Sequence, residues 1–367
     1  MMADDAGAVR VGQVGLGKWG SQLATAALES GKIRFVAGFS RSEEKREAYA
    51  AKFGMETETA YQDLLKRDDI EGVVVSAPNN AHTELCVRAA GAGKHVFVEK
   101  PITNSLSESR QVVEACEKAG VTLMVGHSSR RLGGHRVQKA WIEDGRLGDL
   151  VMIEGNLSNP MGLDLEEGDW LWHQSESPAG ALSQLGVHHM DTLIYLAGPV
   201  KRVSSFMSKR FTPGEIPDVT GTMVEFESGV QGYVGSNFAS PRWTFFIHVY
   251  GTKGNLHYDR FEGLYHKETD EARVAVPYEG VDILRDELDH FADCVRTGAK
   301  PETGGQEGID ALAVVVAAGY ETGPGNLANI GGTVEETHFY LGTGHKSELT
   351  LGIALDQGLP FGPRICE

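Results

Sequence analysis

A glycine-rich turn near the N-terminus is the feature that most constrains how this chain folds. The pattern Gly-x-Gly-x-x-Gly at residues 15–20 directly follows the apolar run 9–14 and opens a stretch with helical periodicity. In a strand–turn–helix context the first glycine permits a tight turn, the second lets a ligand approach the backbone, and the third lets helix and strand pack closely. The helix N-terminus then offers free N–H groups to phosphates. The pattern favours a dinucleotide site over a purely structural turn.

Strand-like and helix-like segments alternate through the first third of the chain. The expected strands cover residues 9–14, 33–39, 73–77, 96–98 and 122–125, and the expected helices cover 19–30, 43–53, 83–91 and 107–120. Short apolar strands that alternate with helices are typical of a parallel sheet covered on both faces. We therefore expect an N-terminal Rossmann domain over residues 1–127.

The pattern changes after this domain. Helices are expected at 134–144, 181–196, 282–296 and 307–318, and strands at 150–155, 202–208, 220–227, 231–237, 244–250 and 254–258. The period-two alternation and hairpin spacing of these strands predict an open, mostly antiparallel sheet. The sequence thus predicts an α/β protein whose second α/β domain covers residues 128–318. The glycine-rich tail 319–367 lacks apolar periodicity, and we expect it to add little to the core.

Composition limits the possible partners and compartments. The chain carries 34 Lys and Arg against 51 Asp and Glu, a formal net charge of −17, which repels nucleic-acid phosphates. Four scattered cysteines fit a reducing compartment, and no apolar stretch reaches the length of a membrane span or a secretory signal core. We expect a cytoplasmic protein that binds neither nucleic acid nor membrane. No residue cluster has metal-ligand spacing, and we expect no metal.

The end of the second expected strand bears on the choice of cofactor. An NAD site usually has Asp or Glu about 20 residues beyond the glycines to hold the ribose 2′-hydroxyl. This chain has Ser40, Arg41 and Ser42 there instead. A guanidinium and two hydroxyls suit a 2′-phosphate, which a carboxylate would repel. We expect NADP(H) to be preferred and NAD(H) to be possible, with a solvated loop arginine as the alternative.

Three motifs in a fixed order carry a family resemblance. They are the glycine motif, a Glu-Lys-Pro motif at residues 99–101 after an apolar strand, and Gly-Val-His at 186–188 on a later helix. With the loop at residues 77–82, this combination resembles the Gfo/Idh/MocA oxidoreductase family over about residues 8–318. The resemblance implies a Rossmann domain followed by an α/β domain whose open sheet covers the substrate.

The resemblance also implies an activity and an assembly. It implies hydride transfer between a nicotinamide and a sugar, cyclitol or related polyol or ketone, and a dimer or tetramer formed through the second domain's sheet. Lys100 would contact the reacting oxygen, His188 would act as the general acid/base, and the Lys100–Pro101 peptide would be cis. Two alternatives remain: an NAD-dependent glycosidase-like enzyme, and a non-catalytic cofactor-sensing regulatory protein on the same fold.

One position departs from the family pattern. Many members carry Asp four residues before the histidine, where this chain has Gln184. The i, i+4 spacing would put Gln184 and His188 on one face of an α-helix. A glutamine amide can orient the imidazole or bind a substrate hydroxyl, but it cannot stabilise an imidazolium by charge.

These arguments define three sets of candidate residues. The catalytic candidates are Lys100, His188 and Gln184. The substrate-binding candidates are Lys100, Arg130, His173, Gln184 and His188. The cofactor-binding candidates are Gly15, Gly17, Lys18, Trp19, Gly20, Ser40, Arg41, Ser42, Ala77, Pro78, Asn79, His82, Glu99 and Lys100.

Overall fold

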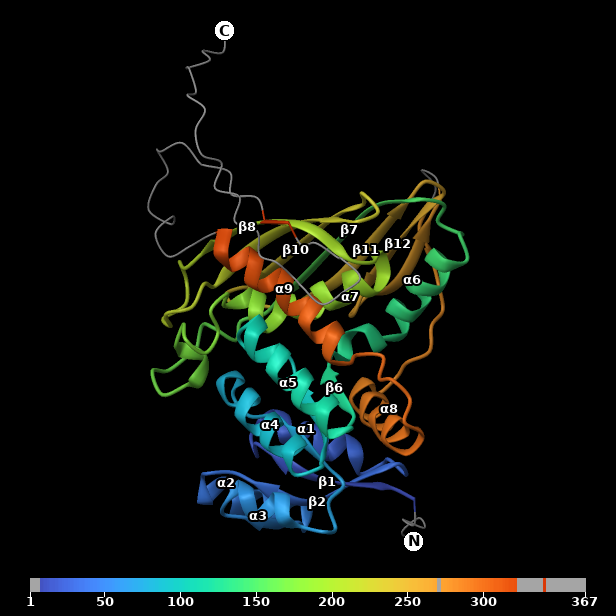
Figure 1. Cartoon of the computed structure of the whole chain (residues 1–367). Helices are drawn as coiled ribbons and strands as arrows, with labels where there is room; N and C mark the ends of the chain where they lie inside the picture. Colours follow the sequence, from blue (N-terminus) through green and yellow to red (C-terminus); the bar gives the residue numbers. More distant parts are fainter. Residues whose placement is uncertain (1–6, 269–271, 322–338, 341–367) are drawn as a thin grey trace.

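The computed structural model describes residues 7–268, 272–321 and 339–340 (Figure 1). Within these residues the chain forms two sheets, a six-stranded one in the first third of the sequence and a nine-stranded one after it. The smaller sheet lies at one end of the molecule and the larger sheet at the other. The predicted α/β class with a Rossmann domain and a second sheet domain is confirmed.

The smaller sheet is parallel throughout, with the strand order β3-β2-β1-β4-β5-β6. Its strands are β1 (Val9–Val14), β2 (Ile33–Phe39), β3 (Glu56–Glu58), β4 (Gly72–Val75), β5 (His95–Glu99) and β6 (Leu123–Gly126). Its helices are α1 (Lys18–Ala27), α2 (Glu43–Phe53), α3 (Tyr61–Lys66), α4 (His82–Gly91) and α5 (Leu106–Ala119). The order reverses between β1 and β4, so a ligand crevice is expected at the carboxyl ends of these strands.

Two elements of this domain were not predicted from the sequence. The edge strand β3 has three polar residues, and α3 has only six residues. Neither is long enough to display a period of two or of 3.6 residues, which is the signal on which the prediction rests.

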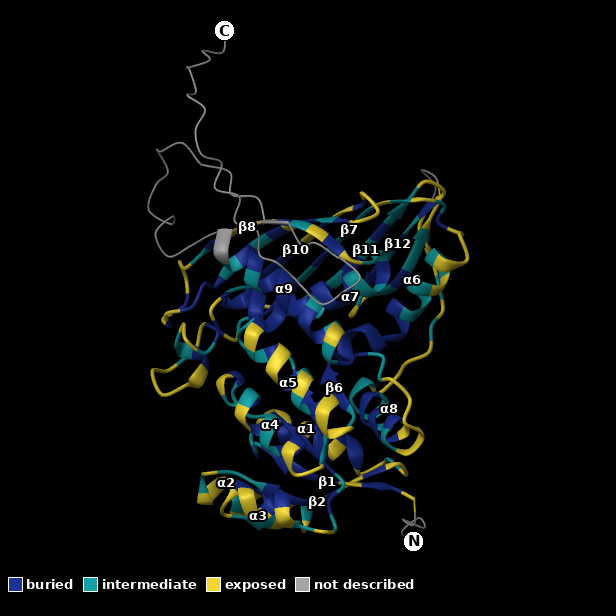
Figure 2. Ribbon diagram, in the orientation of Figure 1, coloured by how far each residue is buried: buried dark blue, intermediate teal, exposed yellow. Residues whose placement is uncertain are grey.

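The larger sheet is mostly antiparallel, as predicted. Its order is β14-β13-β12-β11-β7-β10-β9-β8-β15, and among the described pairings only β7 and β10 run parallel. Its strands are β7 (Leu150–Ser158), β8 (Val200–Ser208), β9 (Val219–Phe226), β10 (Gln231–Asn237), β11 (Thr244–Gly251), β12 (Gly254–Asp259), β13 (Gly263–Lys267), β14 (Val274–Ala275) and β15 (Phe339–Tyr340). The helices α6 (Gly133–Glu143), α7 (Val187–Ala197) and α9 (Gly305–Glu321) pack on one face of it. Figure 2 shows α7 and most of α9 as buried.

Helix α8 (Ile283–Thr297) returns to the first domain, beside which it lies in Figure 1. Its residues Leu288 and Phe291 belong to the core that contains Val9 and Leu23. The Phe291 ring meets the Phe97 ring of β5 edge to face, with centroids 5.8 Å apart. The division at residue 127 thus separates the two sheets, but α8, which follows it in sequence, packs against the first sheet. The domain boundary at residue 127 stays a prediction.

Most of the C-terminal tail lies outside the described residues. The prediction that the tail adds little to the core concerns those residues and stays a prediction. Strand β15 is described, and it pairs antiparallel with β8. Helix α9 runs to Glu321, slightly beyond the expected end at residue 318. Among the helices of the described part, none combines the length and the apolar character needed to cross a bilayer.

Candidate active site

The glycine loop between β1 and α1 forms a cradle that side chains would fill. Gly15 has φ +93°, and a Cβ there would lie 2.6 Å from the Ser76 carbonyl oxygen after β4. A Cβ at Gly20 would lie 2.3 Å from the Gly15 carbonyl oxygen, so this glycine permits close packing of α1. Gly17 is the N-cap of α1, and a Cβ there would meet nothing within 4 Å. The open space at the helix N-terminus fits a pyrophosphate.

The loop after β4 faces this cradle and contacts the second domain. Asn79 is buried, and its Nδ2 donates to the Glu176 carbonyl oxygen at 3.3 Å and to Asn104 Oδ1 at 3.3 Å. Ala77 and Pro78 are half-buried. The loop that carries Glu176 therefore closes over the edge of the Rossmann domain.

His82 corrects one cofactor-binding prediction. The side chain is completely buried, and its Nε2 lies 2.9 Å from the Ala77 carbonyl oxygen. Its Nδ1 lies 3.0 Å from the Pro101 carbonyl oxygen and 3.3 Å from that of Ile102. The ring thus joins the loop after β4 to the loop after β5, and no face of it remains for a cofactor.

The Ser40–Ser42 turn leaves one cation exposed. Among the described contacts the Arg41 side chain forms no hydrogen bond or ion pair, whereas Ser42 Oγ caps α2 by accepting from the Lys45 N–H at 3.3 Å. Arg46 donates to the Ser40 carbonyl oxygen at 2.7 Å and so lies beside the turn. The sequence analysis missed Arg46, although a basic residue in the first turn of the following helix is a usable signal.

Lys100 links the two domains. It follows β5 directly, its peptide bond to Pro101 is cis as expected, and its Nζ donates to the Gln184 carbonyl oxygen at 3.0 Å. Burial lowers the pKa of Lys100, against the opposing effect of the adjacent Glu99 carboxyl. Lys100 therefore sits at the carboxyl edge of the Rossmann sheet, held by the backbone of the second domain.

Gln184 lies in a π-helical turn, Leu182–Gly186, that leads into α7. The sequence predicted a plain α-helix from residue 181; the structure has a wider π-turn between Gln184 and His188 instead. Gln184 is buried, and its Nε2 donates to Ser177 Oγ at 3.2 Å. Single π-turns inside helices are frequent at functional sites because they re-aim backbone groups. Here the re-aimed group is the carbonyl that receives Lys100.

His188 follows this turn as a half-buried imidazole. Its Nδ1 is buried and has no hydrogen-bond partner among the described residues. Burial, and then the positive charge of Lys100, hold the pKa of His188 well below its ordinary value. The ring is neutral at pH 7, which leaves it able to accept a proton. The adjacent His189 is completely buried, with Nε2 3.0 Å from the Phe246 carbonyl oxygen.

A second histidine near this site was missed by the sequence analysis. His127 directly follows β6, and burial lowers its pKa to about 4. Within the described part of the chain neither ring nitrogen has a hydrogen-bond partner, and Nδ1 lies 3.8 Å from Asp191 Oδ1. The signal for it was its place just after a parallel strand, at the edge where ligands bind.

Arg130 and His173 lie differently from what their substrate-binding predictions assumed. Arg130 is buried, and its Nε and Nη2 donate to the two carboxylate oxygens of Asp191 at 2.9 and 2.5 Å. Because Asp191 holds this buried guanidinium from two sides, the prediction that Arg130 binds substrate is wrong. His173 is partly exposed and lies 3.6 Å from Glu215 Oε2, on the loop before the π-turn.

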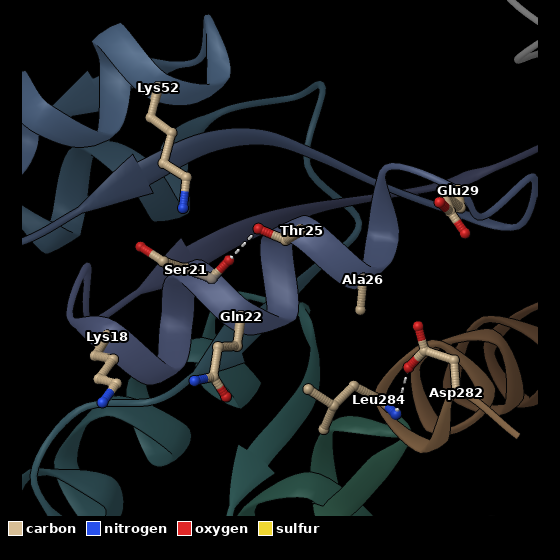
Figure 3. A pocket seen from close by; sticks show the side chains of 9 residues that line it. All are labelled: Lys18, Ser21, Gln22, Thr25, Ala26, Glu29, Lys52, Asp282 and Leu284. Carbon is tan, nitrogen blue, oxygen red and sulfur yellow. Dashed lines mark hydrogen bonds between the residues drawn. The ribbon is translucent and has the colours of Figure 1, made fainter.

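A separate pocket of about 440 Å³ lies along the solvent side of α1 (Figure 3). It is lined by Lys18, Ser21, Gln22, Thr25, Ala26, Glu29, Lys52, Asp282 and Leu284. Lys18 lines this pocket, whereas none of Lys100, Gln184 and His188 does. The hollow is thus distinct from the carboxyl-edge site.

Comparison with known proteins agrees with this geometry. A curated 1,5-anhydro-D-fructose reductase from Ensifer adhaerens is 26% identical over 329 residues, which cover 88% of this chain and 98% of the relative. The NADP(+)-dependent D-xylose 1-dehydrogenase of Haloarcula marismortui is 24% identical over 82% of this chain and 87% of its own. The crystal structure of an oxidoreductase from Desulfitobacterium hafniense DCB-2 superposes with a TM-score of 0.82 at 38% identity, covering 86% of this chain and 95% of that one.

Two family models match successive parts of the chain. Residues 9–127 match the oxidoreductase family with an NAD-binding Rossmann fold, and residues 135–257 match the GFO/IDH/MocA C-terminal domain. Together these segments span more than half of the chain, in the order that the glycine, Glu-Lys-Pro and histidine motifs predicted. The protein belongs to the Gfo/Idh/MocA family of oxidoreductases, which act on CH–OH groups with a nicotinamide cofactor.

Proposed function

We propose that this protein is an NADP(H)-preferring dehydrogenase or reductase for a sugar, cyclitol or related polyol or ketone. The observation that carries the proposal is the meeting of Lys100, from the Rossmann domain, with the π-turn that leads into His188, from the second domain. This meeting point lies at the sheet edge that also bears the glycine cradle. Named relatives include a reductase and a dehydrogenase of sugars, which supports the substrate class.

The chemistry divides between the two side chains. A bound nicotinamide supplies or accepts the hydride. Lys100 would donate a hydrogen bond to the reacting oxygen and stabilise the charge that develops on it. A neutral His188 would accept the carbinol proton during oxidation and return it during reduction. The Gln184 carbonyl would hold Lys100 Nζ in place between turnovers.

The cofactor preference rests on charge at the end of β2. Exposed Arg41 and nearby Arg46 supply two cations beside Ser40, and the turn from Ser40 to Ser42 contains no carboxylate that would repel a 2′-phosphate. The glycine cradle, Trp19, Ala77, Pro78 and Asn79 would hold the remainder of the cofactor.

Net cofactor turnover tests this proposal. NADPH and NADH oxidation would be followed with aldoses, ketoses and cyclitol ketones, and NADP⁺ reduction with the matching polyols. Net consumption of NADPH with at least one carbonyl substrate is expected. Substrate conversion without net cofactor change would support the glycosidase-like alternative. Cofactor binding with no conversion across the panel would support the regulatory alternative.

We also propose a homo-oligomer formed through the open face of the larger sheet. Phe206, Met223 and Tyr233 are exposed at 85%, 43% and 37%, and Met223 pairs with Tyr233 across the strands. Exposed apolar side chains on adjoining strands are typical of interaction surfaces. Light scattering should give a dimer or tetramer, and Phe206→Asp should shift it toward the monomer. Phe261→Asp, at a residue exposed at 63% in the β12–β13 turn, is the matched control.

A further inference from the structure

Helix α8 and strand β5 face each other in a fixed register. Phe97 of β5 meets Phe291 of α8 with ring centroids 5.8 Å apart. Glu99 lies two residues after Phe97 on the same side of the strand, and Glu287 lies one turn before Phe291 on the same side of the helix. Two strand residues advance about 6.6 Å and four helix residues about 6 Å. The charge of Glu99 acts on Glu287, so α8 runs against β5 here and the register sets Glu99 opposite Glu287.

Both of these carboxyl groups are buried, and they have few hydrogen-bond partners. Glu287 is 0% exposed, and neither of its carboxyl oxygens has a hydrogen-bond partner within the described residues. Glu99 is 5% exposed, and its Oε2 accepts from the Lys100 N–H at 3.3 Å while Oε1 has no described partner. Two ionised carboxylates in this setting would be strongly unfavourable.

The neighbouring cation is shared among several carboxylates. Arg131 is buried near Glu287; its Nη1 donates to Asp286 at 2.6 Å and its Nη2 lies 3.5 Å from Glu302, while Nε and Nη2 have no hydrogen-bond partner among the described residues. The other charged groups of α8 that act on Glu287 are Asp282 and Asp286, both negative. Strands β1 and β2 contribute apolar residues to the core around α8. One guanidinium among the carboxylates of Glu99, Asp286, Glu287 and Glu302 leaves an excess of negative charge, which a proton on the buried pair would reduce.

We propose that Glu99 and Glu287 share one proton in a buried acid–carboxylate pair, and that this pair fixes the Glu99 side chain behind Lys100. Glu287 is then a positioning residue that acts through Glu99. Burial, and after it the charge of Glu99, hold the pKa of Glu287 well above its ordinary value. Burial also raises the pKa of Glu99, while the neighbouring Trp19 indole and Lys100 oppose this rise. The pair thereby connects α8 to the glycine loop.

The shared proton has a defined effect on stability. In the unfolded chain a glutamate ionises near pH 4.3, whereas the folded pair keeps its proton above that pH. Unfolding then releases a proton, so the stability of the protein falls as pH rises from about 4.3 toward the raised pKa of the pair. Glu287→Gln keeps the shape of the side chain and a hydrogen-bond donor but removes the titrating group. The variant should therefore not lose stability as the pH rises through this range.

Thermal unfolding of the cofactor-free protein between about pH 5 and pH 8.5 tests the pair. The Tm of Glu287→Gln minus that of the wild type should increase by about 2–4 °C across this range. Glu117→Gln, the same change at an exposed position on α5, should give a constant difference. If Glu287→Gln fails to fold, Glu99→Gln should show the same pH-dependent gain. A pH-independent difference in the variant that folds would overturn the proposal.

The link to the cofactor rests on the proposed function and has its own measurement. Wild-type affinity for NADPH, followed by fluorescence titration, should fall at alkaline pH by up to about tenfold per pH unit once the pair loses its proton. Glu287→Gln should flatten this dependence. Equal pH dependence in both proteins would overturn the positioning role. If no nicotinamide binds at all, the proposed function fails, while the thermal experiment still decides whether the proton is shared.

Discussion

Arg41 is the residue on which the cofactor preference depends most directly. Arg41→Asp should reverse or level a preference for NADPH over NADH, because a carboxylate repels the 2′-phosphate and can accept from the ribose hydroxyls. Fluorescence titration of both cofactors measures the effect. Arg110→Asp, an equal charge change at an exposed position on α5, should leave the ratio unchanged. Equal affinities in the wild type would contradict the assignment.

Gln184 gives a prediction about pH. Because burial and Lys100 hold the pKa of His188 below 6.5, the acidic limb of the oxidation rate should lie below that pH. In Gln184→Asp a nearby negative charge stabilises the imidazolium, so the limb should move to higher pH. Ser177→Ala removes the hydrogen bond of Gln184 without adding charge and should leave the limb in place. If the acidic limb of the pH profile does not move in Gln184→Asp, His188 is not the general base.

At the scale of elements, His82 joins the loops that follow β4 and β5. Because burial lowers the pKa of His82, its neutral ring donates to one carbonyl oxygen, and His82→Ala would leave that acceptor without a donor, at a cost of about 1–3 kcal/mol. A fall in Tm of several degrees is expected from thermal unfolding. His173→Ala, at a partly exposed histidine, should change Tm far less. Similar Tm values for both variants would show that His82 does not stabilise the loops after β4 and β5.

The elements that the sequence predicted and those that it missed differ in what encodes them. Strands β1, β4 and β5 and the glycine turn were predicted because apolar runs and motif spacing are local signals. The π-turn at residues 182–186 was missed because an inserted residue leaves the apolar pattern of a helix nearly unchanged. The packing of α8 against the first domain was missed because an amphipathic pattern shows that one face of a helix is buried but not which element covers that face.

The site shows the same division. Lys100 and His188 could be proposed because their motifs are local and ordered along the chain. His127 and Glu287 could not, because an unpaired buried polar group is defined only by its surroundings. Arg130 and His82 were misjudged for the same reason, since both are consumed by partners distant in sequence, Asp191 and the Pro101 carbonyl.

At the scale of the whole molecule, catalysis is proposed to depend on two sheets held together. The Rossmann domain brings the glycine cradle and Lys100, and the second domain brings the π-turn and His188. The hydrogen bond from Lys100 Nζ to the Gln184 carbonyl oxygen and the Asn79–Glu176 contact both cross between them. The central claim is that Lys100 and His188 act together on one substrate oxygen.

Single-turnover hydride transfer with bound NADPH and a saturating carbonyl substrate tests that claim most directly. Lys100→Ala and His188→Ala should each slow this step by about 10²–10⁴-fold, while NADPH affinity stays close to that of the wild type. Lys118→Ala, at an exposed lysine on α5, should react at the wild-type rate. A rate within about threefold of the wild type in either Lys100→Ala or His188→Ala, far short of that loss, would contradict the account.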